Sequence, residues 1–305
     1  MVWKTFQRLG RFVQSRQVGI ITTSATVVVG LVLYERLKQE RVVLADSRPS
    51  LSDSPRNPDL SNYTLSGNKT GIRWDENWDK RDPKSMVKPP KVETEESLKG
   101  YDEEVKKKTP KATRHLILIR HGQYVDTALI DEERILTALG REQAEITGQR
   151  LRDLDLDYTR MVSSTMARAV ETADIIHKYL PGLQLDRDDI LREGAPIKPE
   201  PYHSTWRPEV YQFHQDGARI EAAFRKYFHR ADAEQKGDSV EIIVCHANVI
   251  RYFACRALQF PPEAWLRISL AHTSLSHFMI RPSGRVILKS LGNSGHLPPT
   301  KVSYS

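Results

Sequence analysis

Short apolar runs alternate with amphipathic segments along the chain from about residue 113 onward. The run 115–119 has the length and composition of a buried strand, and a second strong run covers 240–245. Thr137 is placed to cap an amphipathic helix over 138–154. Further strands are expected at 159–162, 275–281 and 285–291, and further helices at 165–180, 208–231 and 249–258. This alternation predicts an α/β three-layer sandwich with a mostly parallel central sheet over residues 112–305.

The N-terminal region has a different pattern, because residues 18–34 contain no charged side chain. As a helix, this stretch would span about 26 Å, which is enough to cross a hydrocarbon core. Four basic residues and no acidic one precede it, as is typical of mitochondrial import sequences. We therefore expect residues 1–44 to form a basic N-terminus with a single-pass membrane anchor. A secretory signal peptide and an ordinary buried helix are the alternatives.

Residues 45–111 have the composition of an extended, flexible linker, with prolines scattered among Ser, Asp, Asn and Lys. Such a segment lacks the apolar side chains and the backbone donors needed for a core of its own. The motif Trp-Asp-Glu-Asn-Trp-Asp at 74–79 is an exception, because it places two tryptophans in polar surroundings. These either pack on the chain's own domain or anchor another subunit. The run 93–108 is expected to be a solvated helix or loop.

Charge and cysteine content exclude several classes of function. The net charge is +7, and five of these positive charges belong to residues 1–44. A nucleic-acid-binding protein would carry its basic excess on the folded domain, so no nucleic-acid partner is expected. Cys245 and Cys255 are the two cysteines of the sequence, which excludes a disulfide framework and a cysteine-based zinc site.

Charged and imidazole side chains follow three of the expected strands. Arg120 and His121 follow the first strand, Arg168 comes a few residues after the second, and His246 directly follows the run 240–245. The carboxyl ends of parallel strands meet at one edge of a sheet, so we expect these side chains to converge. Two guanidinium groups and two imidazoles would form a cationic pocket for a phosphate dianion.

Phosphoryl transfer from such a pocket requires a nucleophile and an acid. A neutral imidazole is a nucleophile at physiological pH, so His121 is the candidate to accept the phosphoryl group as phosphohistidine. Glu193 is the candidate to protonate the leaving oxygen and then to activate water. Repulsion by the phosphate charge would help Glu193 to keep its proton, and neither a metal nor another cofactor is expected. The alternative roles are a buried structural histidine at 121 and a salt bridge between Glu193 and Arg192.

The motifs around these residues resemble those of the histidine phosphatase, or phosphoglycerate-mutase-like, superfamily. They are Leu-Ile-Arg-His-Gly at 118–122, Leu-Thr-Ala-Leu-Gly-Arg-Glu-Gln-Ala at 136–144, Ser-Ser followed by Arg-Ala and Glu-Thr-Ala at 163–173, and Cys-His-Ala-Asn-Val-Ile-Arg at 245–251. The resemblance covers residues 113–252. The segments 18–34, 74–79, 191–196 and 245–252 are similar to a mitochondrial, membrane-anchored Ser/Thr-protein phosphatase branch of that superfamily.

The resemblance implies a metal-independent phosphatase that acts on phosphoserine and phosphothreonine proteins, with phosphohistidine as a further candidate. It also implies a mitochondrial membrane location and activation by self-association. The implied self-association residues are Trp74, Asp75, Asn77, Trp78 and Asp79. Gln123 stands where mutases of the family usually have Glu, which favours a phosphatase. A small-metabolite phosphatase or mutase and a membrane-tethered assembly scaffold are the alternatives.

Overall fold

The computed structural model describes residues 74–203 and 206–304. The expected membrane anchor at 18–34 and the linker up to residue 73 lie outside the described residues. Within the described part, no helix combines the length and the apolar character needed to cross a bilayer.

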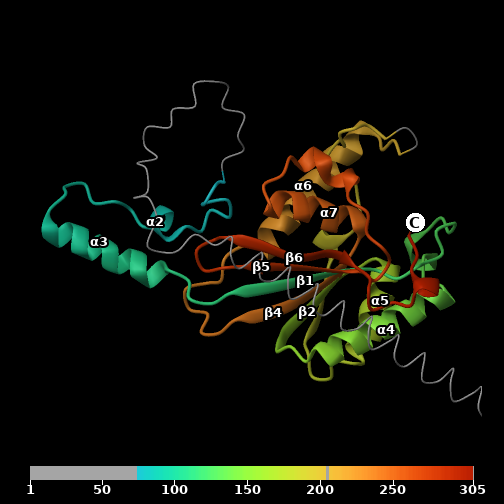
Figure 1. Cartoon of the computed structure of the whole chain (residues 1–305). Helices are drawn as coiled ribbons and strands as arrows, with labels where there is room; N and C mark the ends of the chain where they lie inside the picture. The colour runs from blue at the N-terminus through green and yellow to red at the C-terminus, as the bar shows by residue number, and fades with distance from the viewer. Residues whose placement is uncertain (1–73, 204–205, 305) are drawn as a thin grey trace, which may run out of the picture. The chain divides into compact units, whose positions relative to one another are not determined.

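A six-stranded sheet forms the centre of the domain, in the order β3-β2-β4-β1-β5-β6 (Figure 1). The strands are β1 (Arg114–Arg120), β2 (Tyr158–Ser164), β3 (Leu185–Asp188), β4 (Ser239–Cys245), β5 (Leu275–Ile280) and β6 (Val286–Asn293). The four strands β3, β2, β4 and β1 are parallel, whereas β5 and β6 form an antiparallel hairpin. The sheet is therefore mixed. Its parallel part contains β1, β2 and β4, the strands that precede the candidate site residues, and the antiparallel pair β5 and β6 forms one edge.

Helices cover both faces of the sheet, as the predicted three-layer sandwich requires (Figure 1). The helices are α4 (Ala138–Leu154) and α5 (Ala167–His177) on one face, and α6 (Val210–Tyr227) and α7 (Ala247–Ala257) on the other. Strand β1 supplies side chains to both layers, since successive residues of a strand point to opposite faces. Ile117 and Ile119 pack in the cluster that includes α4 and α5, whereas Leu116 and Leu118 belong to the cluster of α6 and α7.

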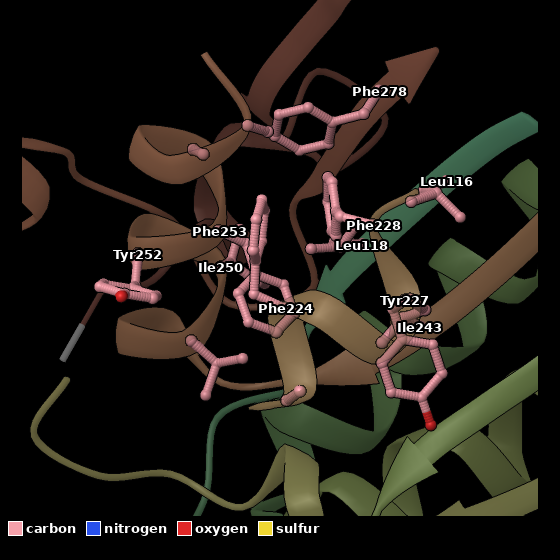
Figure 2. Packing of buried hydrophobic residues seen from close by; sticks show 14 of the residues in the cluster. Leu116, Leu118, Phe224, Tyr227, Phe228, Ile243, Ile250, Tyr252, Phe253 and Phe278 are labelled. Atoms are coloured by element: carbon pink, nitrogen blue, oxygen red, sulfur yellow. The ribbon is translucent and has the colours of Figure 1, made fainter. Parts of the chain in front are cut away.

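Aromatic side chains dominate the core on the α6 and α7 side (Figure 2). The Phe224 and Phe228 rings stack with their centroids 5.2 Å apart, and the Phe253 ring lies 5.4 Å from that of Phe228. Each fully buried ring of this kind stabilises the fold by roughly 1.5–3 kcal/mol. This core fixes α6 and α7 on the sheet, and both helices contribute to the site described below.

The expected helices are present, and their ends differ by a few residues. Helix α4 covers the expected range, and the Thr137 side chain accepts a hydrogen bond from the Gly140 amide at 3.1 Å. The run 93–108 contains α3 (Glu95–Lys108), a helix without buried residues that begins in a capping box at Thr94. Strand β3 and the short helices were not expected. The short helices are α2 (Pro83–Met86), η2 (Asp131–Glu133), η3 (Asp189–Leu191), η4 (Pro262–Arg267) and η5 (Pro299–Lys301).

The Trp-rich motif packs on the chain's own domain, in a stretch that was expected to be extended linker. Trp78 is 7% exposed, and its indole N–H donates to the Gly284 carbonyl at 2.8 Å. The Asp79 carboxylate accepts from the Arg230 amide at 2.8 Å and lies 3.5 Å from its buried guanidinium group. The folded domain therefore includes this motif, because burial of the indole and of this ion pair stabilises the packed form.

Candidate active site

The structure brings His121, Arg168 and His246 together at one edge of the sheet. His121 follows β1, Arg168 lies in the first turn of α5, and His246 joins β4 to α7. The Arg168 Nε atom is 3.3 Å from the His121 Nε2 atom, and the His121 and His246 ring centroids are 5.2 Å apart. All three residues are at most 3% exposed. Their polar groups therefore form a buried cluster beyond the strand ends rather than a surface patch.

His121 has the protonation state of a nucleophile. Its Nδ1 atom lies 2.8 Å from the Gly122 carbonyl oxygen, which can only accept, so Nδ1 carries the proton. The Nε2 atom consequently presents a lone pair, toward which the Arg168 Nε–H points. Burial, with the nearby His246, Arg168 and Arg120, lowers the pKa of His121 well below its usual value. The imidazole is therefore neutral at physiological pH.

The two arginines are held by neighbours outside the predicted site. Arg120 donates to the Leu270 carbonyl at 2.6 Å, and burial lowers its pKa to about 10, so it stays protonated at neutral pH. Arg168 pairs with Asp131 at 3.3 Å and stacks over the Tyr124 ring, 4.7 Å from its centroid. These contacts fix two cationic groups in place before any ligand binds.

His246 is a second neutral imidazole in this buried cluster. Its Nε2 atom lies 2.8 Å from the Ser164 hydroxyl, and its buried Nδ1 atom has no hydrogen-bond partner among the described residues. Burial and the charges of Arg168 and Arg120 lower its pKa well below the usual value. A buried polar atom without a partner is costly unless a ligand or water binds it, so Nδ1 is available to a bound oxyanion.

Glu193 lies next to these groups and has the character of an acid. Its carboxylate accepts hydrogen bonds from the amides of Gly194 at 3.1 Å and Asn248 at 3.4 Å. Burial raises its pKa, although these bonds and the Arg168 and Arg120 charges oppose the rise. The pKa of Glu193 is thus raised, and the main cause without a bound phosphate is desolvation rather than like-charge repulsion.

Sequence comparison assigns the segment that carries these residues to one protein superfamily. The family model described as Histidine phosphatase superfamily (branch 1) matches residues 116–291. The chain belongs to the histidine phosphatase superfamily.

Relatives of this histidine phosphatase include two proteins with names that state an activity. It is 54% identical to the mitochondrial serine/threonine-protein phosphatase PGAM5 of Mus musculus over 232 residues, which are 76% of this chain and 81% of that protein. The mitochondrial Pgam5 of Drosophila willistoni is 54% identical over 230 residues, with 74% and 78% covered. A crystal structure of phosphoglycerate mutase from Plasmodium falciparum is 33% identical, with a TM-score of 0.44, 64% of this chain covered and all of that one.

The motif at 136–144 packs against the loop that carries His121. The Gln143 side chain accepts from the Gln123 amide at 3.0 Å, and the Thr172 hydroxyl accepts from the Gly122 amide at 3.0 Å. At Gly140, a Cβ atom would lie 1.9 Å from the Gln123 carbonyl oxygen, so only glycine fits there. The start of α4 therefore lies directly against the backbone that carries His121.

Tyr124, Asp131 and His272 were not predicted as site residues. Tyr124 and Asp131 lie in the irregular segment between β1 and α4, where no periodic pattern gives a signal. His272 precedes β5, and Leu275 of β5 pairs with Ile119 at the carboxyl end of β1. The start of an antiparallel strand thus lies at the same edge as the ends of its parallel neighbours, and that rule could have identified His272.

Proposed function

We propose that this chain is a mitochondrial Ser/Thr-protein phosphatase that acts through a phosphohistidine at His121. The observation that carries the proposal is the unprotonated His121 Nε2 atom, which faces the Arg168 guanidinium group within a buried cluster of guanidinium and imidazole groups. The names and high identities of the relatives support the activity and the compartment. Gln123, which replaces the acid usual in mutases, supports hydrolysis over phosphoryl rearrangement.

In the first step, the His121 Nε2 lone pair attacks phosphorus in line with the ester oxygen of the substrate. The N–P bond forms, the P–O bond to the Ser or Thr side chain breaks, and Glu193 gives its proton to the leaving oxygen. Arg120, Arg168 and His246 bind the phosphoryl oxygens, which keep their charge throughout. The proton of His121 stays on Nδ1, where it is hydrogen-bonded to the Gly122 carbonyl oxygen, so the ring accepts the phosphoryl group without a second proton transfer.

In the second step, a water molecule attacks the phosphohistidine. The Glu193 carboxylate now removes a proton from that water, the N–P bond breaks, and the His121 lone pair is restored. Orthophosphate leaves, and Glu193 is protonated again for the next cycle. The cycle balances in protons and electrons with groups of this chain and water alone.

Trapping of the covalent intermediate tests this mechanism. Enzyme mixed with a radiolabelled phosphoserine protein and quenched should retain label that is stable in base and labile in acid, as expected for phosphohistidine. The variant His121→Ala should lose the label, whereas the control variant His115→Ala, in the strand that precedes His121, should keep it. Label on another residue, or turnover by His121→Ala at the wild-type rate, would refute the mechanism.

Substrate class requires a separate measurement. We expect turnover of phosphoserine and phosphothreonine peptides to exceed that of sugar phosphates by at least about tenfold in kcat/KM, a difference of roughly 1.4 kcal/mol in transition-state binding. A phosphohistidine peptide in the same panel tests the further candidate substrate. Preference for a sugar phosphate, or transfer of its phosphoryl group to another position, would identify a metabolite phosphatase or a mutase instead.

We further propose that the Trp-rich motif drives self-association and that docking of the motif activates the enzyme. Its docking site includes Phe224, whose ring lies 5.9 Å from that of Trp78, together with Arg230 and Gly284. This site can accept the motif of a second copy in the same geometry, which is the usual basis of exchange between protomers. Trp74 is 36% exposed and remains free to contact that second copy.

Membrane anchoring through residues 18–34, in a single pass across a mitochondrial membrane, is the remaining part of the proposal. The length of the apolar run and the basic, acid-free start support it. Deletion of residues 1–44 should release a soluble enzyme that keeps its activity. Loss of folding on deletion would mean that the segment belongs to the folded domain.

A further inference from the structure

His272 forms part of the wall of the active site but has no role in the mechanism above. It is 2% exposed, and its ring centroid lies 5.6 Å from that of His121. The amide of the next residue, Thr273, donates to the backbone carbonyls of Arg120 at 3.1 Å and His121 at 3.3 Å. The loop before β5 is therefore bonded directly to the backbone of His121, and the His272 ring is held beside the His121 ring.

The C-terminal segment contacts His272 through one serine. The Ser303 hydroxyl lies 2.9 Å from His272 Nδ1, and the Ser303 carbonyl accepts from the His272 amide at 2.9 Å. The same hydroxyl accepts a hydrogen bond from the Gln143 side-chain amide at 2.8 Å. The side-chain amide of Gln143 cannot be flipped, because its oxygen accepts from the Gln123 amide and its nitrogen also donates to the Lys301 carbonyl.

This chain of bonds favours one tautomer of His272. The Ser303 oxygen accepts from Gln143, which leaves its own hydrogen free to be donated to His272 Nδ1. Burial and the Arg120 charge lower the pKa of His272 to about 3, so the ring is neutral and carries one proton. With Nδ1 as acceptor, that proton is on Nε2. The Nε2 atom is buried and has no hydrogen-bond partner in the described part of the chain.

We propose that His272 Nε2–H donates a hydrogen bond to an oxygen of the phosphoryl group on His121, and that Ser303 sets its tautomer. The inference rests on the proposed phosphohistidine mechanism and adds a fourth donor residue to Arg120, Arg168 and His246. A fixed neutral donor stabilises the charge of the transferring group without reorganisation. Ser303 acts through His272 and is therefore a positioning residue, which connects the C-terminal segment to catalysis.

Two substitutions of His272 test the donor. His272→Phe keeps the size of the ring and removes the N–H, whereas His272→Gln keeps an amide donor. We expect His272→Phe to lower kcat on the order of 10²-fold and to weaken inhibition by orthovanadate at least tenfold, with an unchanged thermal midpoint. His272→Gln should keep most of the wild-type kcat and most of the inhibition by orthovanadate. The matched control is His296→Phe, a half-buried histidine bonded to the Thr147 hydroxyl, and it should change neither quantity.

The tautomer of His272 provides a measurement that does not depend on whether a variant folds. In wild-type enzyme labelled with ¹⁵N-histidine, the His272 resonances should show the Nε2–H form and should shift when orthovanadate is added. Ser303→Ala should move His272 toward the Nδ1–H form and lower kcat with little change in KM. An Nδ1–H tautomer in the wild type, or His272→Phe with wild-type kcat and vanadate inhibition, would overturn the proposal.

The trapping experiment separates this inference from the mechanism on which it rests. If wild-type enzyme carries label on His121 and His272→Phe behaves as wild type, only the role of His272 is refuted. If wild-type enzyme carries no label on His121, the phosphohistidine mechanism itself is refuted, whatever His272 does.

Discussion

The Arg219 Nη2 atom of α6 lies 3.1 Å from the backbone carbonyl oxygen of Glu193. Arg219 also donates to the Arg192 carbonyl at 2.5 Å, so it holds the backbone that carries the proposed acid. On the same helix, Phe224 packs against Trp78. Helix α6 thus connects the docked Trp-rich motif to Glu193, which gives a physical route by which motif docking can order the active site.

Arg219→Gln tests this connection. We expect kcat to fall roughly tenfold, because the Glu193 segment loses its anchor, and KM to change little, since the phosphate-binding groups remain in place. The control is Arg152→Gln, which removes an exposed ion pair with Asp153 on α4. Steady-state kinetics on a phosphoserine peptide measures kcat and KM for the two variants. An Arg219→Gln enzyme with unchanged kcat would exclude α6 as the connection.

Glu193→Gln should slow the first step in proportion to the basicity of the leaving oxygen. A serine oxygen needs the proton, whereas p-nitrophenolate leaves without one, so label should form on His121 at a near-normal rate from p-nitrophenyl phosphate only. The pKa of Glu193 is raised. In wild-type enzyme the rate with phosphoserine should therefore fall as pH rises through that pKa, because the acid is lost. Rapid-quench measurements across pH should show this limb in wild type and not in the variant.

Trp78→Ala and Trp74→Ala should separate folding from assembly. Removal of the buried Trp78 indole should lower the free energy of unfolding by about 3 kcal/mol and reduce both assembly size and turnover. Trp74 is partly exposed, so its loss should reduce assembly with little change in stability. Denaturant titration and sedimentation velocity measure the two effects. If Trp78→Ala sediments as the wild type does, the motif has no role in self-association.

Gly140→Ala should disrupt both stability and activity, because its methyl group would lie 1.9 Å from the Gln123 carbonyl oxygen. Relief of that contact must move the loop that carries His121, at a cost of roughly 2–3 kcal/mol. The matched variant is Gly100→Ala in α3, where a Cβ atom meets nothing within 4 Å. It should leave activity unchanged and favour the helix by about 0.5–1 kcal/mol. Equal stability and activity of the two variants would contradict this account.

Mild acid should already destabilise the fold, at pH values higher than those at which carboxylates titrate. Burial lowers the pKa of His272 to about 3 and those of His277 and His296 to about 4. Between pH 6.5 and 4 the unfolded chain therefore binds protons that the native chain does not, and the free energy of unfolding falls as pH falls. Urea titrations at pH 7.5, 6 and 5 should show a steady decrease. Constant stability over this range would mean that these imidazoles are charged in the native state.

The strand–helix alternation and the residues at the parallel strand ends could be predicted from the sequence. These features are local: a buried strand followed by Arg120 and His121, or by His246, can be recognised without knowledge of contacts. Asp131 was missed because its role comes from a contact with Arg168, 37 residues away, inside an irregular segment. The packing of Trp78 could not be decided either, since its partners on α6 and in the β5–β6 turn are distant in sequence.

The alternating side chains of β1 have a consequence for how this sequence can vary. Leu116 and Leu118 fill one hydrophobic layer, while Ile117 and Ile119 fill the opposite one. Insertion or deletion of a single residue within this strand would send the side chains on one side of the change to the wrong layer and displace His121 from Arg168 and His246. Variation between related sequences should therefore be confined here to exchanges of similar volume, with length changes found only in the flanking loops.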